Sequence, residues 1–105
     1  MTNKFEQISS NSGFMKHNGG LLFRTISESE YEFKTNINEK HLNRVKITHG
    51  GYIASIIDAG SGTAASRSAG NVPCVTISLD IKYIAPSKEG DEITGLTKIL
   101  KKTKT

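Results

Sequence analysis

The sequence has little of what exported, disulfide-bonded or membrane-spanning proteins depend on. Its one cysteine, Cys74, excludes a disulfide within the chain and fits a reducing compartment. No apolar run approaches the about 20 residues that a helix needs to cross a bilayer. The first ten residues, MTNKFEQISS, lack the apolar stretch of a signal peptide. We therefore expect a cytoplasmic protein that does not associate with membranes.

The chain is also short and poor in apolar residues, and its excess positive charge is confined to one end. With 105 residues it holds at most one domain, and an apolar share of 35% is below the usual globular value. This low share is consistent with a partner that completes the core, or with a chain that is not whole. Ten basic and ten acidic residues balance each other outside four lysines near the end: Lys98, Lys101, Lys102 and Lys104. This end suits a polyanionic partner such as a phosphorylated cofactor, or is a solvated lysine run.

Residue spacing excludes several kinds of site. The basic residues are not interleaved with aromatics and form no broad patch, so we do not expect nucleic-acid binding. The histidines, His17, His41 and His49, lack metal-ligand spacing, so no metal site is expected. Residues 60–65 fit G-x-G-x-x-A, but they neither follow a strand nor open a helix, as a dinucleotide site requires.

The periodicity of apolar residues predicts an α+β domain. Residues 31–37 and 74–85 alternate apolar and polar side chains, which is the pattern of a half-buried strand. The predicted order is strand, strand, helix, strand, strand, over residues 21–26, 31–37, 49–68, 74–85 and 91–100. We expect the first two and the last two strands to pair as antiparallel neighbours, with the helix against the sheet. A short helix is also expected within residues 1–20.

The predicted helix at 49–68 is rich in small residues. Thr48 stands where an N-cap is expected. Residues at helical spacing form the expected buried stripe: Ile53, Ile56, Ile57, Gly60 and Ala64. Two internal glycines each cost roughly 1 kcal/mol in helix propensity, so the helix needs a sheet to support it.

The start of this helix, Thr48-His49-Gly50-Gly51, is the first candidate site. The first N–H groups of a helix have no internal partner and favour negative charge. Glycine lets a ligand oxygen approach the backbone closely, which suits an oxyanion that develops during acyl transfer. His49 stands beside that position as a hydrogen-bond donor. The alternative is a loop turn with an incidental histidine.

Asp58 is the second candidate, as a general base or a nucleophile. It lies on a helix flank with small residues, namely Ala54, Ser61, Gly62 and Ala65. The alternative is a half-exposed aspartate without a role. Asp58 lies about 13 Å along the helix axis from His49, whereas a general base must be within about 3 Å of its proton. We therefore predict a homodimer in which Asp58 of the partner subunit completes the site.

Asn43, His49-Gly50-Gly51 and Asp58 together resemble the pattern of hotdog-fold thioesterases of the phenylacetic-acid-degradation (PaaI-like) type. Asn43 stands six residues before the histidine and Asp58 nine after it, as in that family. Residues 75–86 resemble the family's long strand with its terminal Tyr-x-x-Pro, and residues 88–91 resemble the following turn. The resemblance implies a hotdog fold, in which an antiparallel sheet wraps a central helix. It also implies hydrolysis of an acyl-CoA thioester by a homodimer or a dimer of dimers.

The resemblance implies a role for each matching residue. Gly50 polarises the thioester carbonyl through its N–H, while Asn43 and His49 position the thioester. Asp58 of the partner subunit activates a water or attacks directly. Thr76 matches a position where relatives carry a serine or threonine that orients this water; otherwise it is an ordinary strand threonine.

Coenzyme A is the implied carrier of the acyl group, so no separate cofactor is expected. The candidate substrate contacts are the backbone of Gly51 and, by location only, the side chains of Lys88, Lys101 and Lys102. The alternative functions are a domain that binds acyl-CoA without cleaving it, and an inactive fragment.

The sequence departs from the family pattern in two places. Relatives often have glycine three residues after the asparagine, where this chain has Lys46. Relatives also continue with further strands beyond the region of Thr105. The resemblance therefore predicts that the single hotdog domain at 1–105 is incomplete at its C-terminus.

Overall fold

Residues 4–103 are described in the computed structural model. In chain order its elements are β1 (Glu6–Ile8), α1 (Gly13–His17), β2 (Leu21–Thr25), β3 (Glu30–Asn36), the 3-10 helix η1 (Glu39–His41), α2 (Gly50–Ser68) and β4 (Glu92–Lys98). The predicted helix at 49–68 and the predicted strands at 21–26, 31–37 and 91–100 are confirmed, with small shifts at their ends. The short helix expected near the N-terminus is α1, whereas β1 was not predicted. Lys104 of the basic end lies outside the described residues.

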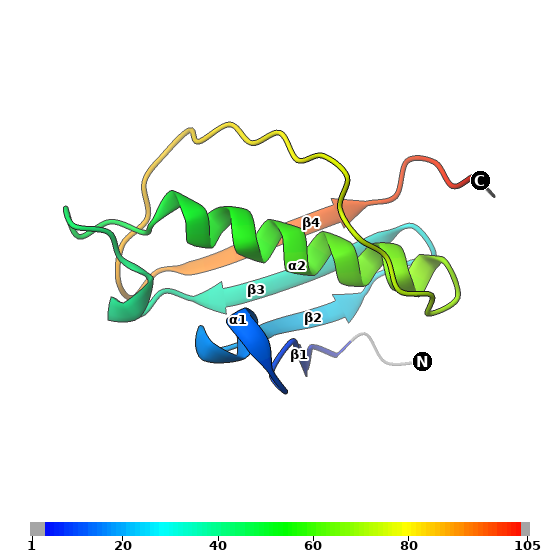
Figure 1. Cartoon of the computed structure of the whole chain (residues 1–105), viewed down its shortest axis with the longest axis horizontal. Coiled ribbons are helices and arrows are strands. Elements are labelled where there is room, and N and C mark those ends of the chain that lie inside the picture. The colour runs from blue at the N-terminus through cyan, green and yellow to red at the C-terminus, as the bar shows by residue number, and fades with distance from the viewer. Residues whose placement is uncertain (1–3, 104–105) are drawn as a thin grey trace.

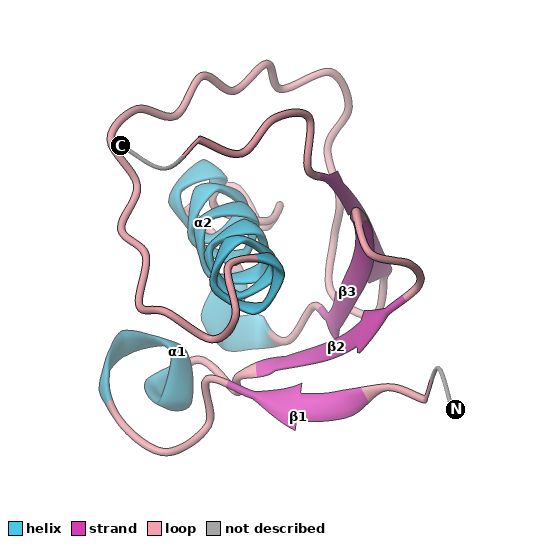
Figure 2. Cartoon of the chain, turned by 90° about the vertical axis from the view of Figure 1, so that its right-hand side faces the viewer, coloured by secondary structure: helices cyan, strands magenta, loops and turns pink. Residues whose placement is uncertain are grey.

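The described strands form one antiparallel sheet in the order β1-β2-β3-β4, and α2 lies along one face of it (Figures 1 and 2). The predicted hairpin of β2 and β3 is confirmed, with Phe23 opposite Phe33. β4 pairs with β3, and Phe33 stands opposite Gly95. The pairing predicted between residues 74–85 and 91–100 is therefore wrong.

The core lies between α2 and the sheet. Four residues of α2 at a spacing of four are buried: Tyr52, Ile56, Gly60 and Ala64. Ile53 and Ile57, also predicted for the buried stripe, are half-buried at its edge. The sheet contributes mainly alternate residues of β2 and β3 together with Ile37: Leu21, Phe23, Tyr31, Phe33 and Ile37. Strand alternation and helical spacing therefore meet in a single apolar layer.

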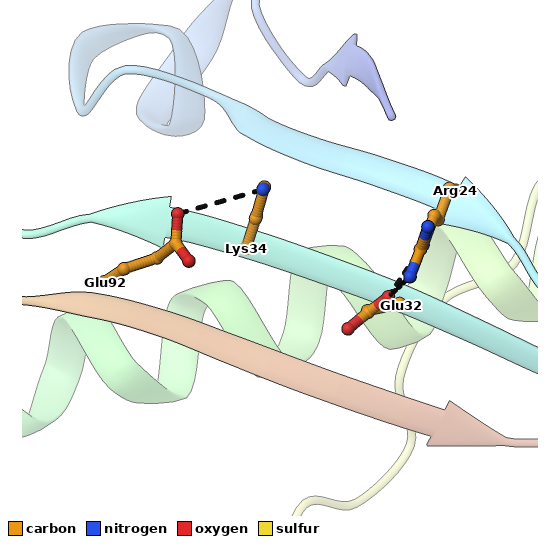
Figure 3. A network of polar contacts seen from close by, with 4 residues as sticks. All are labelled: Arg24, Glu32, Lys34 and Glu92. Carbon is orange, nitrogen blue, oxygen red and sulfur yellow. Dashed lines mark hydrogen bonds and ion pairs between the residues drawn. The ribbon is translucent and has the colours of Figure 1, made fainter. Parts of the chain in front are cut away.

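The other face of the sheet is polar. Since Tyr31 and Phe33 are buried, the residues that follow them in the alternation point away from α2. Figure 3 shows two ion pairs there: Arg24 Nε donates to Glu32 at 2.7 Å, and Lys34 Nζ lies 3.8 Å from a carboxylate oxygen of Glu92. Each pair joins neighbouring strands, so both support the antiparallel register.

The strand predicted at 74–85 is not formed. Residues 72–86 run as an extended loop along the side of α2 that the sheet leaves uncovered (Figures 1 and 2). Val75 is 90% exposed and Ile77 is 98% exposed. A strand needs a neighbour to satisfy its backbone groups, and within residues 4–103 no strand lies beside this segment. Residues 74–85 do alternate apolar and polar side chains, but in the described part of the chain no strand edge pairs with them.

Candidate active site

The first turn of α2 is capped by a histidine. His49 is the N-cap residue, and its Nδ1 accepts the N–H of Gly51 at 2.9 Å. The prediction of Thr48 as N-cap is therefore wrong. Thr48 is buried instead, where its N–H donates to the Ser87 carbonyl and its Oγ1 accepts the Ser87 hydroxyl. A neutral imidazole that accepts at Nδ1 carries its proton on Nε2, so His49 presents an N–H at that atom.

The N–H of Gly50 is free. No group within residues 4–103 accepts a hydrogen bond from it. Gly50 lines a pocket of ≈ 570 Å³ at the start of α2, with walls from two loops, α2 and β4: Asn43, Ile47, Thr48, Ile53, Lys82, Tyr83, Ile84, Ala85, Pro86, Ser87 and Ile93. A free N–H at the positive end of a 19-residue helix is suited to a negatively charged oxygen. The N–H of Gly51, in contrast, is already bonded to His49.

Asn43 shapes the loop before α2. Its Oδ1 accepts the N–H groups of Val45 at 2.9 Å and Ile47 at 3.3 Å. Lys46 sits at the turn of this loop with φ 70°, a left-handed conformation that glycine adopts without cost. Lys46, where relatives often have glycine, therefore stands at a strained position of this loop. The loop places Asn43 in the wall of the Gly50 pocket.

Tyr83 closes this pocket from the other side. Its hydroxyl donates to the Gly50 carbonyl at 2.8 Å, and its ring lies 3.3 Å from where a Cβ on residue 50 would be. From the sequence we assigned no role to Tyr83. The available signal was its position at the end of the alternating stretch, in the Tyr-x-x-Pro motif, but the alternation alone places it in a strand.

Asp58 and Thr76 are brought together. The Thr76 hydroxyl donates to the Asp58 carboxylate, and both side chains are exposed. They line two pockets between α2 and residues 73–79. Neither pocket shares a lining residue with the pocket at Gly50. Within one chain, therefore, the carboxylate and the helix start face separate spaces.

The candidate lysines lie at two different places. Lys88 directly follows Ser87, which lines the Gly50 pocket, and its side chain is exposed. Lys101 is exposed beyond β4, and Lys102 Nζ donates to the carbonyl of Ser68 at 3.1 Å. Because Ser68 is the last residue of α2, Lys102 lies at the opposite end of the helix from Gly50. These two groups of lysines do not meet within one chain.

A buried histidine, His41, holds the backbone that leads into the start of α2. His41 is 2% exposed and stacks on Tyr52 with ring centroids 3.9 Å apart. Its Nδ1 accepts the N–H of Asn38, and its carbonyl accepts the N–H of His49 at 2.8 Å. Burial raises the pKa of the Tyr52 phenol above its ordinary value, and a hydrogen bond with Thr35 acts in the opposite direction. These contacts fix the backbone that leads into α2.

Features of two other kinds of site are absent from residues 4–103. Across residues 4–103, no three His, Cys, Asp or Glu side chains are close enough together to hold a metal ion. No helix in the same part of the chain is long and apolar enough to span a bilayer.

Comparisons with known proteins agree on one family. A family model described as Thioesterase superfamily matches residues 46–105. Acyl-coenzyme A thioesterase 13 of Mus musculus is 35% identical over 69 residues, which are 66% of this chain and 49% of that protein. The Homo sapiens protein of the same name is 32% identical over the same shares. The chain thus spans about half the length of the curated relatives that it matches.

Solved structures agree with this family in three dimensions. Zebra fish thioesterase superfamily member 2 superposes with a TM-score of 0.81 at 26% identity, covering 91% of this chain and 70% of that one. Thioesterase superfamily member 2 from Mus musculus gives a TM-score of 0.69 at 27% identity, covering 80% and 61%. The predicted α+β hotdog fold is confirmed. With more than half of its residues inside the matched region, the chain belongs to the thioesterase superfamily.

Proposed function

We propose that this chain hydrolyses acyl-CoA thioesters to the free acid and coenzyme A, as a PaaI-like member of its superfamily. The observation that carries the proposal is the free N–H of Gly50, which lies in a pocket at the positive end of α2. The relatives named acyl-coenzyme A thioesterase 13 support the substrate class. No cofactor beyond the coenzyme A of the substrate is part of the proposal.

The Gly50 end of the site stabilises negative charge on the thioester oxygen. A carbonyl oxygen seated at the Gly50 N–H gains negative charge as the carbon becomes tetrahedral. We assign the Nε2–H of His49 and the side-chain amide of Asn43 as further donors. Asn43 lines the pocket, whereas His49 caps α2 next to Gly50 and is not among the lining residues. Loss of one such donor typically lowers kcat by about 100-fold or more.

The other half of the site is Asp58, which we assign as general base or nucleophile, with Thr76 orienting the attacking water beside it. The Thr76 hydroxyl already donates to the carboxylate. Because Gly50 and Asp58 line separate pockets, one chain does not assemble the site. We place Asp58 of the partner subunit opposite Gly50, in a homodimer or a dimer of dimers with antiparallel α2 helices. The same arrangement brings Lys102, which lies at the far end of α2, toward the neighbouring helix start.

A subunit-mixing experiment tests this assignment. The variants Asp58→Asn and His49→Ala are each expected to release little thiol from a panel of acyl-CoAs. Co-expressed with two different tags, they form mixed dimers in which one of two sites has both intact residues. Mixed dimers purified through both tags are then expected to show about half of the wild-type activity. If the site lies within one chain, mixing restores nothing.

The rival functions predict different outcomes in the same assay. A domain that binds acyl-CoA without cleaving it retains ligand binding but releases no thiol, with or without Asp58→Asn. An inactive fragment shows neither hydrolysis nor a cooperative unfolding transition. A cytoplasmic location is part of the proposal and rests on the single free cysteine. The incompleteness predicted for the C-terminus stays a prediction.

A further inference from the structure

One peptide group connects Tyr83 to His49. The Tyr83 hydroxyl donates to the carbonyl of Gly50 at 2.8 Å. The N–H of the same peptide belongs to Gly51 and donates to His49 Nδ1 at 2.9 Å. A hydroxyl, a peptide and an imidazole thus form one continuous line of hydrogen bonds across the start of α2.

We propose that Tyr83 is a positioning residue that fixes the tautomer of His49 through the Gly50–Gly51 peptide. The inference rests on the proposed hydrolysis, in which His49 donates from Nε2. A hydrogen bond to a peptide carbonyl polarises the peptide and strengthens the bond that its N–H donates. Tyr83 therefore favours the ring form in which Nδ1 accepts and Nε2 carries the proton.

The Gly50–Gly51 peptide joins two glycines, so a contact from another part of the chain helps to hold its orientation. Gly50 and Gly51 have no side chains, so within the first turn of α2 no side chain at these positions restricts the rotation of the peptide that joins them. The peptide also lies in the first helical turn, whose N–H groups have no internal acceptor. Its N–H side is held by His49 itself, so Tyr83 on the carbonyl side is an anchor independent of the histidine.

A second contact of the same loop provides a matched control. Ser87 also ties residues 83–87 to the helix start, because its hydroxyl donates to Thr48 Oγ1 at 2.6 Å. The hydroxyl of Ser87 bonds to Thr48 and not to the Gly50–Gly51 peptide, unlike that of Tyr83. If Tyr83 only held the loop in place, removal of the Ser87 hydroxyl would disturb His49 in the same way.

The direct test is the nitrogen spectrum of the His49 ring, assigned by the loss of its signals in His49→Ala. In the wild-type chain at a pH where the ring is neutral, we expect the signature of a proton on Nε2. In Tyr83→Phe we expect a mixture of both tautomers, while Ser87→Ala keeps the wild-type form. A single Nε2–H form in Tyr83→Phe overturns the proposal, and so does an equal change in both variants.

The kinetic test follows the same line of bonds. Removal of the Tyr83 hydroxyl in Tyr83→Phe is expected to lower kcat about 3- to 10-fold, with little change in KM. The control Tyr31→Phe removes a hydroxyl that donates to the Glu28 carbonyl, away from the site, and keeps the wild-type kcat. In a His49→Ala background, Tyr83→Phe has no further effect if it acts through His49. An equal loss in both backgrounds overturns the proposal.

The two kinds of readout separate this inference from the proposed function. If the wild-type chain releases no thiol from any acyl-CoA, the proposed hydrolysis fails. The tautomer comparison between Tyr83→Phe and Ser87→Ala still decides the role of Tyr83, because it needs no substrate.

Discussion

The ring of Phe33 fills the space that a side chain on Gly95 would need. The two residues face each other across β3 and β4, and a Cβ on Gly95 would overlap the ring. The same ring meets Gly60 of α2, so Phe33 is enclosed between two glycines from different elements. The close approach of helix and sheet thus depends on absent side chains on both sides of one phenylalanine.

The first prediction concerns this enclosure. Gly95→Ala is expected to lower the free energy of unfolding by about 1–3 kcal/mol through overpacking. In the double variant Gly95→Ala/Phe33→Leu, the loss should be smaller than the sum of the single losses, because the shorter side chain makes room. Denaturant unfolding measures all three values. Gly62→Ala is the control: its Cβ meets nothing, so helix propensity should raise stability by up to about 1 kcal/mol. Additive losses at Gly95 and Phe33 would contradict the enclosure.

The second prediction concerns the strained turn at Lys46. Its φ of 70° disfavours a residue with a Cβ, so Lys46→Gly should stabilise the chain by about 0.5–1 kcal/mol after the entropy of the unfolded glycine is subtracted. Asn71, at φ 67°, is the matched comparison. Because asparagine tolerates this conformation better than lysine, Asn71→Gly should gain less. Thermal unfolding of both variants measures the difference, and a larger gain at Asn71 would argue against strain at Lys46.

The third prediction separates the hydroxyl of Thr76 from its shape. Thr76→Val keeps the shape but removes the hydrogen bond to Asp58, so kcat should fall about 10-fold or more. Thr76→Ser keeps the hydroxyl and should retain most of the activity. Thiol release under saturating acyl-CoA measures both. Equal activity of the valine and serine variants would remove Thr76 from the mechanism.

The fourth prediction is a dependence on alkaline pH. Desolvation by burial raises the pKa of Tyr52 above 10.0, which the bond with Thr35 does not cancel. The resulting stability is present below the unfolded pKa and is lost as pH rises through the folded pKa. Tyr52→Phe lacks the Thr35 bond and should be less stable at neutral pH by about 0.5–1.5 kcal/mol. That gap should narrow above about pH 10 in parallel unfolding titrations. A gap that stays constant would show that Tyr52 does not titrate differently on folding.

The sequence predicted the elements whose apolar face has a packing partner within the described chain. Alternation in residues 31–37 and helical spacing in residues 49–68 both report one buried face, and both are confirmed. β1 escaped prediction because it has only three residues, two of them polar, which is too few for a period. The N-cap was assigned to Thr48 on general preference, whereas a histidine one position later accepts the bond.

The site residues named from the sequence stay a prediction, and the contacts between them could not be predicted from it. The pairing of Thr76 with Asp58 and the closure of the Gly50 pocket by Tyr83 both depend on how residues 72–86 return along α2. No local pattern encodes that path. Alternation in 74–85 reports that one face prefers burial, but it does not state which strand supplies the partner edge. The strand prediction was wrong for this reason.

The segment from Cys74 to Leu79 has a consequence for handling the protein. It is uncharged, alternates apolar side chains and exposes Val75 and Ile77 almost fully, with its backbone unpaired in the described chain. These are the properties of a cross-β former. Pro73 precedes it, and Asp80, which pairs with Lys82 at 2.8 Å, follows it as gatekeeping residues against fibril growth. Solubility at high concentration therefore depends on a few residues that flank the segment, and neutralising Asp80 should bring on aggregation before any loss of folded structure.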